Sequence, residues 1–475
     1  MHAPEHTIFP QVGGTEEEFR GSYTIHSPER VTESLEPVVH TILDHISTYC
    51  PPIDKRKQFR SNGGRIYEDG GIEAATPECD SPLQQTAYIR ANSEIVLAGI
   101  KDFIRNKSVI KGYPISARLQ RRTIDSTTKS WGCHDNLSFL NPQFANTLEY
   151  PHQKLAWTRY LETRGIISGA GYVNNGGVYF SQKMSKNNRF TAGTHQRTPI
   201  LLMHDYRQGV GRLEIRCSDV NLKEWACIAR LGNAALFQAA SQTGLLSKMA
   251  RSQYYAITGT GTVLNMMPLD EKGNLQDTSQ LQKIIDLQEY TFDTILNELE
   301  SQAGEPIPAD LQVIGERTLD YLKDLRRVSR GEAGVELLTA RSDWAQKLHV
   351  IQANLHRHTG SSPTDIAAQT IDLAYDTIGV TAERNGSVVE KRGYGYIQAD
   401  KHRLTSAEDV SLAMQQPPAS TRSAQRVAGA SHAKAQGAVD VDVKWDQVSY
   451  TLPGQVGVKV KKLNKLLPVT EPAAA

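Results

Sequence analysis

A short stretch of alternating polar and apolar residues organises the N-terminal part of the chain. Residues 62–80 read NGGRIYEDGGIEAATPECD and open on a Gly-Gly turn. In a strand, the period of two would place Arg65, Tyr67 and Asp69 together on one face. A face directed at a core would carry Val, Ile or Leu. Three alternating polar side chains therefore predict either a functional site or the solvated face of an antiparallel sheet.

The same alternation occurs nearer the N-terminus, in the sequence VGGTEEEF at residues 12–19. As a strand, this segment would carry Glu16 and Glu18 on one face and Glu17 on the other. Three consecutive carboxylates repel one another unless a cation lies among them, and a divalent metal ion would serve. A solvated run of charge is the alternative interpretation.

Two further stretches place charged side chains where a strand is expected. The sequence VGRLEIRCSD spans residues 210–219. Its alternation puts Arg212, Glu214 and Arg216 on one face, which suits phosphate and metal chemistry or, alternatively, a salt-bridge ladder between strands. Upstream, His134 follows the sequence SWGC, and it would either bind metal or phosphate or serve as a structural histidine.

Helical periodicity dominates the rest of the chain. Residues 27–49 begin with Ser27 and a proline in the first turn and carry an apolar stripe, which predicts a helix. The helix expected over residues 222–243 is rich in Ala and ends at Gly244. Apolar stripes predict the remaining helices at residues 84–105, 278–302, 309–328, 336–356 and 363–378.

The composition changes near residues 385–400. Residues 416–437 are poor in bulky apolar side chains and resemble a linker. The sequence VDVDVKWDQVSY that follows alternates like a strand, and residues 459–465 resemble the basic end of a helix. We therefore expect a small folded unit at the C-terminus.

Composition and charge narrow the class of function. The 475 residues include 53 Lys and Arg and 52 Asp and Glu, and the formal net charge of +1 gives no electrostatic case for nucleic acid or a membrane surface. No apolar run approaches membrane-spanning length, and the first residues do not resemble a secretion signal. Five scattered cysteines predict free thiols in a reducing compartment, so we expect a cytoplasmic protein.

Together, the carboxylates and arginines on several predicted strands match a site that holds Mg²⁺ on carboxylate oxygens and nucleotide phosphates on arginines. The glycine-rich segment at residues 169–180 lacks the strand-GxGxxG-helix context of a dinucleotide loop, and turns between short strands explain it better. The sequence has no P-loop and no kinase signature. The phosphate chemistry would therefore belong to another ATP-binding fold.

Seven motifs resemble those of the Pup ligase and Pup deamidase family, whose members share the glutamine synthetase catalytic fold. They are GTEEEF, NGGRIYED, EAATPECDS, SWGCHDN, DLAY, PPASTR and VDVKW, in the family's order from residue 13 to about 465. The resemblance implies an α+β fold with a curved antiparallel β-sheet flanked by helices. A glutamine synthetase-like catalytic domain would occupy residues 1–400, and a small C-terminal domain at residues 401–475 would pack on the ATP site.

The resemblance also implies roles for individual residues. Asp69 matches the catalytic aspartate, Glu16 and Glu73 match Mg²⁺ ligands, and Tyr67 matches a residue at the metal. The predicted ATP contacts are Arg65, Thr76 and Trp445.

The charged strand RLEIR departs from Pup ligases, in which the matching strand looks like RLHVI. It resembles the RxExR strand of glutamine synthetase, which supplies a Mg²⁺ ligand and a substrate arginine. Glu214 is accordingly a predicted metal ligand, and Arg216 is a further predicted nucleotide contact. Glu18, from the run of glutamates, and His134 complete the predicted metal ligands. The turn at residues 70–72 is two residues shorter than in the family and lacks its His-Pro pair.

The resemblance implies an ATP- and Mg²⁺-dependent ligase. In the family, the ligase phosphorylates the C-terminal glutamate of Pup, a small protein tag, and a substrate lysine attacks the γ-glutamyl phosphate to form an isopeptide bond. The deamidase, an amide hydrolase, carries an extra loop between the first Glu strand and NGxRxYxD. Residues 20–61 leave no room for that loop, which favours the ligase.

Three alternatives remain open. The first is an amide hydrolase on the same scaffold. The second is a divergent ligase that joins another glutamate-ended peptide or small molecule to an amine. A non-catalytic protein that binds a nucleotide or a tag is the third, but the presence of Glu16, Arg65 and Asp69 together argues against it.

Overall fold

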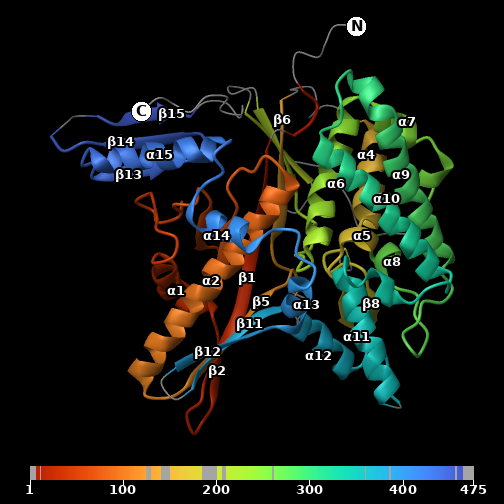
Figure 1. Cartoon of the computed structure of the whole chain (residues 1–475), viewed down its shortest axis with the longest axis horizontal. Coiled ribbons are helices and arrows are strands. Elements are labelled where there is room, and N and C mark those ends of the chain that lie inside the picture. The colour runs from red at the N-terminus through yellow and green to blue at the C-terminus, as the bar shows by residue number, and fades with distance from the viewer. Residues whose placement is uncertain are drawn as a thin grey trace. The chain divides into compact units, whose positions relative to one another are not determined.

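The computed structural model describes residues 7–10, 12–124, 130–140, 150–184, 200–205, 210–258, 261–358, 360–384, 387–454 and 457–463. The chain forms two compact units, each assembled from separate stretches of sequence (Figure 1). The first unit comprises Met1–Pro10, Arg122–Asp376 and Tyr394–Leu404, and the second comprises Gln11–Arg121, Thr377–Gly393 and Thr405–Ala475. The chain thus enters the second unit for the last time after Leu404, close to the boundary predicted near residue 400. The predicted division at this boundary into catalytic and C-terminal domains stays a prediction.

An antiparallel sheet is the framework of the second unit. Four of its strands follow the order β12-β11-β5-β1. Their bounds are Gly13–Ile25 for β1, Ile115–Arg121 for β5, Thr377–Arg384 for β11 and Ser387–Arg392 for β12. Three short strands extend this sheet, because β2 (Val31–Ser34) and β4 (Ile72–Ala75) both pair with β1, and β3 (Arg65–Glu68) pairs with β4.

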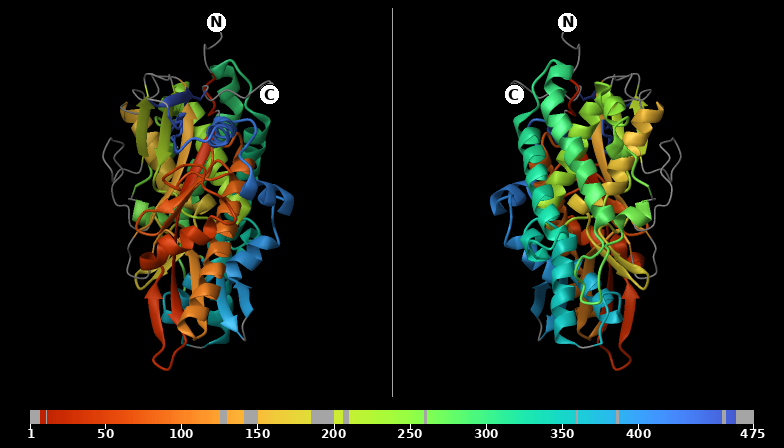
Figure 2. Two further views of the ribbon diagram at one scale, coloured as in Figure 1. Left: turned by 90° about the vertical axis from the view of Figure 1, so that its left-hand side faces the viewer. Right: turned by 90° about the vertical axis from the view of Figure 1, so that its right-hand side faces the viewer.

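A long helix, α2 (Pro82–Lys111), lies along the strands of this sheet (Figures 1 and 2). The hydroxyl of Ser81 caps its N-terminus by accepting a hydrogen bond from the backbone N–H of Gln84. Gly112 ends the helix in the left-handed conformation that glycine adopts without steric cost. The helix predicted at residues 84–105 is therefore confirmed and is longer than expected.

The helix predicted at residues 27–49 is only partly correct. Residues Val31–Ser34 form strand β2, Glu36–Val38 form a short 3₁₀ turn, and helix α1 spans only Val39–Ile46. Strand β2 begins with two β-branched residues and pairs along β1, so the strand ladder overrides the local helical pattern.

The last part of the second unit contains two helices and a three-stranded sheet. Helices α14 (Ala407–Gln415) and α15 (Arg422–Ala435) precede strands β13 (Asp440–Val443), β14 (Gln447–Thr451) and β15 (Lys459–Lys462). The strand predicted from VDVDVKWDQVSY is confirmed, whereas the linker-like segment contains α15 and the predicted basic helix end forms β15. Pairing with β14 supplies backbone hydrogen bonds to this strand, which an isolated helical turn could not match.

The first unit contains three antiparallel strands in the order β6-β10-β9. They span Cys133–Phe139 (β6), Val210–Ile215 (β10) and Ile200–Asp205 (β9). A separate hairpin of β7 (Tyr172–Asn174) and β8 (Gly177–Tyr179) confirms that the glycine-rich segment forms turns between short strands.

Helices form most of the first unit, and their apolar faces meet in one large core. The predicted helices at residues 222–243, 278–302 and 309–328 are confirmed, whereas the one predicted at 336–356 begins only at Asp343, where Ser342 caps it. The helices are α4 Pro151–Thr163, α5 Gly165–Ser168, α6 Glu224–Gln242, α7 Leu245–Met249, α8 Gly261–Asn265, α9 Ser279–Ala303, α10 Ala309–Ser329, α11 Asp343–Arg357, α12 Ile366–Tyr375 and α13 Tyr394–Asp400, with 3₁₀ turns at Gln253–Tyr255 and Val335–Leu338.

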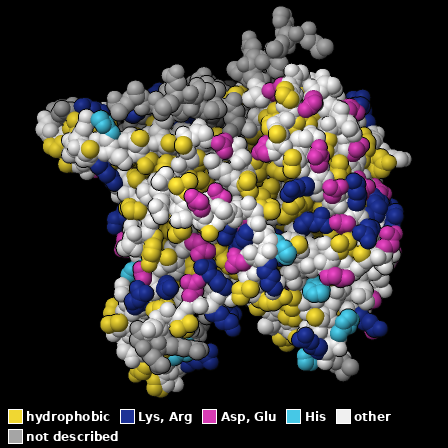
Figure 3. Space-filling view, in the orientation of Figure 1, with side chains coloured by type: hydrophobic (Ala, Val, Ile, Leu, Met, Phe, Trp, Pro, Cys, Tyr) yellow, Lys and Arg dark blue, Asp and Glu magenta, His cyan; other side chains and the backbone are white. Residues whose placement is uncertain are grey.

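Helices α9 and α10 expose charged side chains of both signs (Figure 3). Arg326 of α10, for example, pairs with Asp286 and Glu289 of α9. Within the part of the chain that the structure describes, no helix is both long and apolar enough to cross a membrane. Each of the five cysteines is a buried free thiol.

Candidate active site

Strands β3, β4 and β1 bring the predicted site residues of the second unit into two rows. Tyr67 lies opposite Glu73, and Glu73 lies opposite Glu18. One step along the ladder, Arg65 lies opposite Ala75, and Ala75 lies opposite Glu16. Residues directly opposite each other in an antiparallel ladder share a face. One face of these strands, called the polar face below, therefore carries Arg65, Tyr67, Glu16, Glu18 and Glu73.

The other face of these strands is directed into the protein. Ile66 is buried there, with only 1 % of its surface exposed. Glu17 is also buried, and its carboxylate accepts two hydrogen bonds from the Arg121 guanidinium, at 2.7 and 3.1 Å. The run of three glutamates is therefore divided as the alternation predicted, with two carboxylates on the polar face and one in a buried ion pair.

The polar face concentrates negative charge around Glu73. Burial raises the pKa of Glu73 to about 7, and the carboxylates of Glu16, Glu18 and Asp69 add to this rise. The Tyr67 hydroxyl donates a hydrogen bond to Glu73, and burial together with that carboxylate raises the pKa of Tyr67. The four carboxylates therefore lie close enough to repel one another, which is an environment that favours a bound cation.

Asp69 does not lie on the strand from which it was predicted. Strand β3 ends at Glu68, and Asp69 is an exposed residue of the turn that leads to β4. Its backbone N–H donates to the carbonyl oxygen of Gly71 at 3.0 Å, and Gly70 has a φ of +60°. Asp69 nevertheless raises the pKa of Glu73, so the turn holds its carboxylate near the polar face.

Whether the carboxylates fit Mg²⁺ depends on their chemistry and spacing. Among the described residues, no group of three or more His, Cys, Asp or Glu side chains is already arranged to hold a metal ion. Mg²⁺ is usually held by one or two carboxylates together with substrate phosphates and water, rather than by a complete protein cage. Glu16, Glu18 and Glu73 therefore fit such an ion as donors, although they form no finished site by themselves.

Aromatic and cationic side chains adjoin the polar face at Arg65. Its guanidinium carbon lies 4.3 Å from the centre of the Tyr67 ring and 5.3 Å from that of Phe59. Its Nη2 atom donates a hydrogen bond to the side-chain oxygen of Gln58 at 2.6 Å. The ring of Trp445 meets Phe59 edge to face at 5.1 Å. Two predicted ATP contacts, Arg65 and Trp445, thus flank the same phenylalanine.

Thr76, the remaining predicted ATP contact in this unit, has a local structural partner. Only 3 % of its surface is exposed, and its hydroxyl accepts a hydrogen bond from the backbone N–H of Thr15 at 3.0 Å. This bond ties the end of β4 to the start of β1. A nucleotide contact by Thr76 stays a prediction.

Sequence reasoning missed the role of Glu78, which forms a buried ion pair with helix α15. Its carboxylate accepts hydrogen bonds from Arg422 at 2.7 Å and from Arg426 at 2.6 Å. Arg426 is fully buried and also donates to the carbonyl oxygens of Gly63 and Trp445. This cluster joins the turn before β3 to the segment that carries Trp445. The sequence offered no signal for it, because the partners lie more than 340 residues apart.

The ion pair of Glu78 predicts a pH dependence of stability. Burial alone would raise the pKa of Glu78, but Arg426 and Arg422 together lower it to about 2. A carboxyl group with a lowered folded-state pKa stabilises the fold above its unfolded pKa of about 4.3, and this contribution is lost as pH falls toward 2. We therefore expect the free energy of unfolding to fall between about pH 4.3 and 2, and by less in Glu78→Gln. Urea unfolding at several pH values would measure this; equal pH dependence in both proteins would contradict it.

The first unit gathers the other predicted site residues on one face of β6 and β10. Glu214 is buried, and its carboxylate is bonded by Arg216 at 2.7 Å and Arg212 at 3.0 Å. The Nδ1 atom of His134 lies 3.4 Å from the same carboxylate. The two arginine bridges to Glu214 therefore run along one strand segment, unlike the ladder between strands that the sequence left open, and only His134 approaches from the neighbouring strand. The metal-binding roles of His134 and Glu214 and the nucleotide contact of Arg216 stay predictions.

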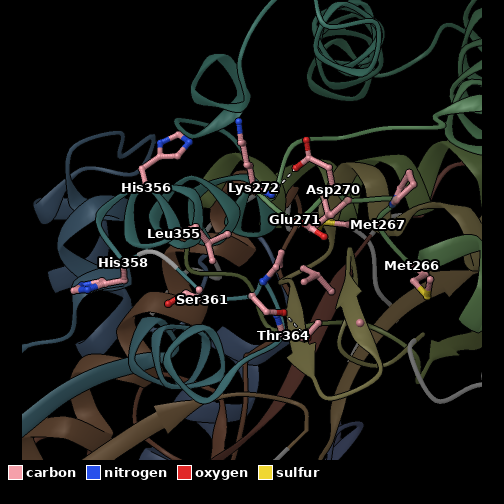
Figure 4. Close-up of a pocket in the computed structure, with 17 residues that line it drawn as sticks. Met266, Met267, Asp270, Glu271, Lys272, Leu355, His356, His358, Ser361 and Thr364 are labelled. Atoms are coloured by element: carbon pink, nitrogen blue, oxygen red, sulfur yellow. Dashed lines mark hydrogen bonds between the residues drawn. The ribbon is translucent and has the colours of Figure 1, made fainter.

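A cavity of about 840 Å³ lies elsewhere in the first unit (Figure 4). Its lining includes the apolar residues Met267 and Leu355 and the polar residues Asp270, Lys272 and His358. The two labelled histidines do not converge on a common point (Figure 4). No predicted site residue lines this cavity, so its size alone does not make it the active site.

Comparisons with known proteins agree with the motifs. The Pup-ligase protein family model matches residues 3–449. A Pup–protein ligase of Acidimicrobium ferrooxidans is 25% identical over 381 residues, covering 78% of both chains. One of Mycobacterium tuberculosis is 25% identical over 462 residues, covering 92% of both chains.

Solved structures agree with the fold. The complex of the prokaryotic ubiquitin-like protein Pup and its ligase PafA matches with a TM-score of 0.72 at 18% identity, covering 98% of this chain and 91% of that chain. PafA in complex with ADP matches with a TM-score of 0.63 at 19% identity, covering 87% of each. The mixed α and β architecture with its antiparallel strands is therefore that of PafA. Because the family model matches nearly the whole chain, the chain belongs to the Pup-ligase protein family.

Proposed function

We propose that this chain is an ATP- and Mg²⁺-dependent ligase that joins the C-terminal glutamate of a Pup-like protein tag to a lysine amine of a protein substrate. One observation carries the proposal. The face formed by β3, β4 and β1 presents Arg65, Tyr67, Glu73, Glu18 and Glu16 in two adjacent rows. Cationic, phenolic and carboxylate groups side by side suit the binding of a triphosphate and its metal ion.

Glu16, Glu18 and Glu73 would hold Mg²⁺, and Tyr67 would orient Glu73 through its hydroxyl hydrogen bond. When bound, the ion offsets negative charge on the phosphates and their leaving oxygen. Arg65 would contact the nucleotide phosphates through its guanidinium. Trp445, next to Phe59, would supply an aromatic surface for the base.

The reaction needs activation of an acid and deprotonation of an amine. A carboxylate oxygen of the tag's glutamate attacks the γ-phosphorus of ATP, and ADP leaves. The lysine amine then attacks the acyl carbon of the γ-glutamyl phosphate, and inorganic phosphate leaves. An ammonium cannot attack, so Asp69 would take the proton of the amine from its exposed position in the turn.

The short segment between β1 and β3 favours a ligase over a hydrolase. This segment contains β2, a 3₁₀ turn and the eight-residue helix α1, which matches the short connection expected of a ligase. An amide hydrolase on the same scaffold and a ligase for another glutamate-ended molecule are the alternatives.

Two parallel incubations distinguish these functions. The protein is supplied with Mg-ATP, a glutamate-ended Pup-like tag and a lysine-bearing protein, and in parallel with a glutamine-ended tag. A ligase forms ADP and a conjugate only with the glutamate-ended tag. A hydrolase releases ammonia from the glutamine-ended tag, and a binding protein does neither; either result would contradict the proposal.

Glu16→Gln should weaken Mg²⁺-dependent nucleotide binding by at least about tenfold, because the amide keeps the shape of the side chain but loses its negative charge. Isothermal titration with ATP would measure the affinity with Mg²⁺ and, as the control, with EDTA. An unchanged affinity in the presence of Mg²⁺ would remove Glu16 from the proposed metal ligands.

Trp445→Ala should raise the KM for ATP by roughly five- to 150-fold and change kcat by less than about twofold. Stacking on a base contributes about 1–3 kcal/mol and acts equally on the ground state and the transition state. Trp445→Phe is the matched control, since it keeps an aromatic ring beside Phe59 and should retain most of the affinity. An effect confined to kcat would argue against this role.

We further infer a cytoplasmic location and a lysine-bearing protein as the acceptor.

Glu214→Gln directly tests whether the predicted site residues of the first unit take part in Mg²⁺ binding. If Glu214 binds Mg²⁺, this variant should require more Mg²⁺ for half-maximal activity. An unchanged Mg²⁺ requirement would leave Glu214 as the centre of a structural ion-pair cluster with Arg212 and Arg216.

A further inference from the structure

Arg20 places a guanidinium on the same face of β1 as the predicted metal-binding glutamates. Strand β1 continues past Glu18, so the period of two that aligns Glu16 with Glu18 also aligns Arg20. Nη2 of Arg20 lies 2.5 Å from the Glu18 carboxylate, and the two side chains are only 16% and 17% exposed. The charge of Glu18 is therefore offset by a neighbouring cation from its own strand.

The guanidinium of Arg20 fits against the turn between β3 and β4. The β1–β4 ladder pairs Phe19 with Ile72, so the next position brings Arg20 opposite Gly71. A Cβ atom added to Gly71 would collide with the Arg20 guanidinium. The guanidinium therefore occupies the space that any other residue at position 71 would fill with its side chain.

This contact lies directly beneath the turn that carries Asp69. Gly71 accepts the backbone hydrogen bond of Asp69, and an added Cβ on Gly70 would lie 3.8 Å from Nη2 of Arg20. The cavity that remains beside Arg20 and Gly71 measures only about 10 Å³, near the lower limit for one water molecule. Removal of the guanidinium would leave the turn without its packed support.

We propose that Arg20 is a positioning residue, which seats the Gly70–Gly71 turn and so fixes Asp69 beside the polar face while it holds Glu18 in place. This inference rests on the proposed function for the role of Asp69. The contact between Arg20 and the turn does not depend on that function and can be tested without it.

The first experiment is hydrogen exchange on the substrate-free protein. Arg20→Ala should accelerate exchange of backbone amides in the segment from Glu68 to Ile72 by at least about threefold, while exchange in α2 stays unchanged. Gly71→Ala should have a similar effect, because its new methyl group displaces the guanidinium. In the double variant the methyl group has no guanidinium to displace. The backbone amides from Glu68 to Ile72 should therefore exchange at the same rate in the double variant as in Arg20→Ala.

Unchanged exchange in the turn, or effects of the two substitutions that simply multiply, would overturn the inference. If Arg20→Ala accelerates exchange throughout the protein, Arg20→Lys takes its place. Lysine keeps the charge but lacks the planar group that lies against Gly71, so exchange should still accelerate in the turn alone. The matched control is Arg105→Ala, since Arg105 pairs with Asp102 on the exposed surface of α2.

The second experiment measures conjugate formation. Arg20→Ala should lower kcat by about ten- to a hundredfold, as expected when a catalytic group is misplaced, and should weaken ATP affinity by less than about tenfold, because Glu18 loses its partner but keeps its charge. Arg20→Lys should recover part of kcat, and Arg105→Ala should behave as wild type. Equal kcat in wild type and Arg20→Ala would contradict the inference. An inactive wild-type protein would count against the proposed function, and hydrogen exchange would still decide the role of Arg20.

Discussion

Asp69→Asn is expected to lower the rate of conjugate formation by about 10²- to 10⁴-fold, the range that a general base contributes. Asparagine keeps the size of the side chain and can occupy the same turn, but its amide cannot accept a proton from the attacking amine. Nucleotide affinity should stay within about threefold, because Asp69 belongs to the turn rather than to the rows of β3, β4 and β1. Single-turnover assays with the tag and a lysine substrate would measure the rate, and titration would measure the affinity.

Glu68→Gln is the matched control for this prediction. Glu68 is the neighbour of Asp69 but has the opposite orientation in the strand, and its carboxylate pairs with the exposed His40 at 2.6 Å. We expect this variant to react at nearly the wild-type rate. Full activity in Asp69→Asn would remove Asp69 from the proposed chemistry, and a loss of nucleotide binding would reassign it to the metal site.

Glu78→Ala is expected to lower the free energy of unfolding by about 3–5 kcal/mol, the cost typical of breaking a buried ion pair by removing one partner. The fully buried guanidinium of Arg426 would lose its carboxylate, and Arg422 would lose the same partner. Because these contacts hold α15 against the turn before β3, unfolding should begin in the last part of the second unit. Urea unfolding followed by far-UV circular dichroism would measure the loss.

Asp44→Ala is the control for this prediction, because Asp44 and Lys57 form an exposed pair in the same unit. Removal of an exposed pair should change the free energy of unfolding by less than about 1 kcal/mol. A loss in Glu78→Ala no larger than that of the control would mean that Arg422 and Arg426 find other partners. The ion pair would then not be what holds the C-terminal segment in place.

The candidate site was predictable wherever local alternation decides which way a side chain points. The period of two assigned Glu16 and Glu18 to one face and Glu17 to the other, as observed. The same rule placed Arg65 and Tyr67 together on β3. It could not place Asp69, because the strand ends one residue earlier and the position of a turn residue depends on its own backbone conformation.

Long-range contacts were not predictable in this way. Nothing near Glu78 in the sequence indicates that two arginines of α15 surround it, since the partners meet only after the chain has folded. For Glu214, the sequence pattern predicted the neighbouring side chains but could not decide the role of the carboxylate. The pattern of RLEIR correctly predicted two arginines beside a carboxylate, but the pattern is the same for a metal ligand and for an ion-pair cluster.

Where the observed secondary structure differs from the predicted one, pairing with another strand determined it. Residues 31–34 lie within the helix predicted at residues 27–49, yet they pair with β1. Residues 459–462 pair with β14, although their lysines resemble a helix end. In both cases the partner strand lies outside the local window that periodicity can read. Long helices such as α2, α9 and α10 were predictable because their apolar stripes extend over many turns.

In the proposed mechanism, this protein makes a glutamate reactive by transferring a phosphoryl group to it. A glutamate-ended Pup-like tag labelled with ¹⁸O in its γ-carboxylate tests this directly. After conjugation with Mg-ATP and a lysine substrate, we expect inorganic phosphate that carries one ¹⁸O atom from the tag for each bond formed. Conjugate accompanied by unlabelled phosphate would rule out a γ-glutamyl phosphate, because the carboxylate oxygen would then never have been bonded to phosphorus.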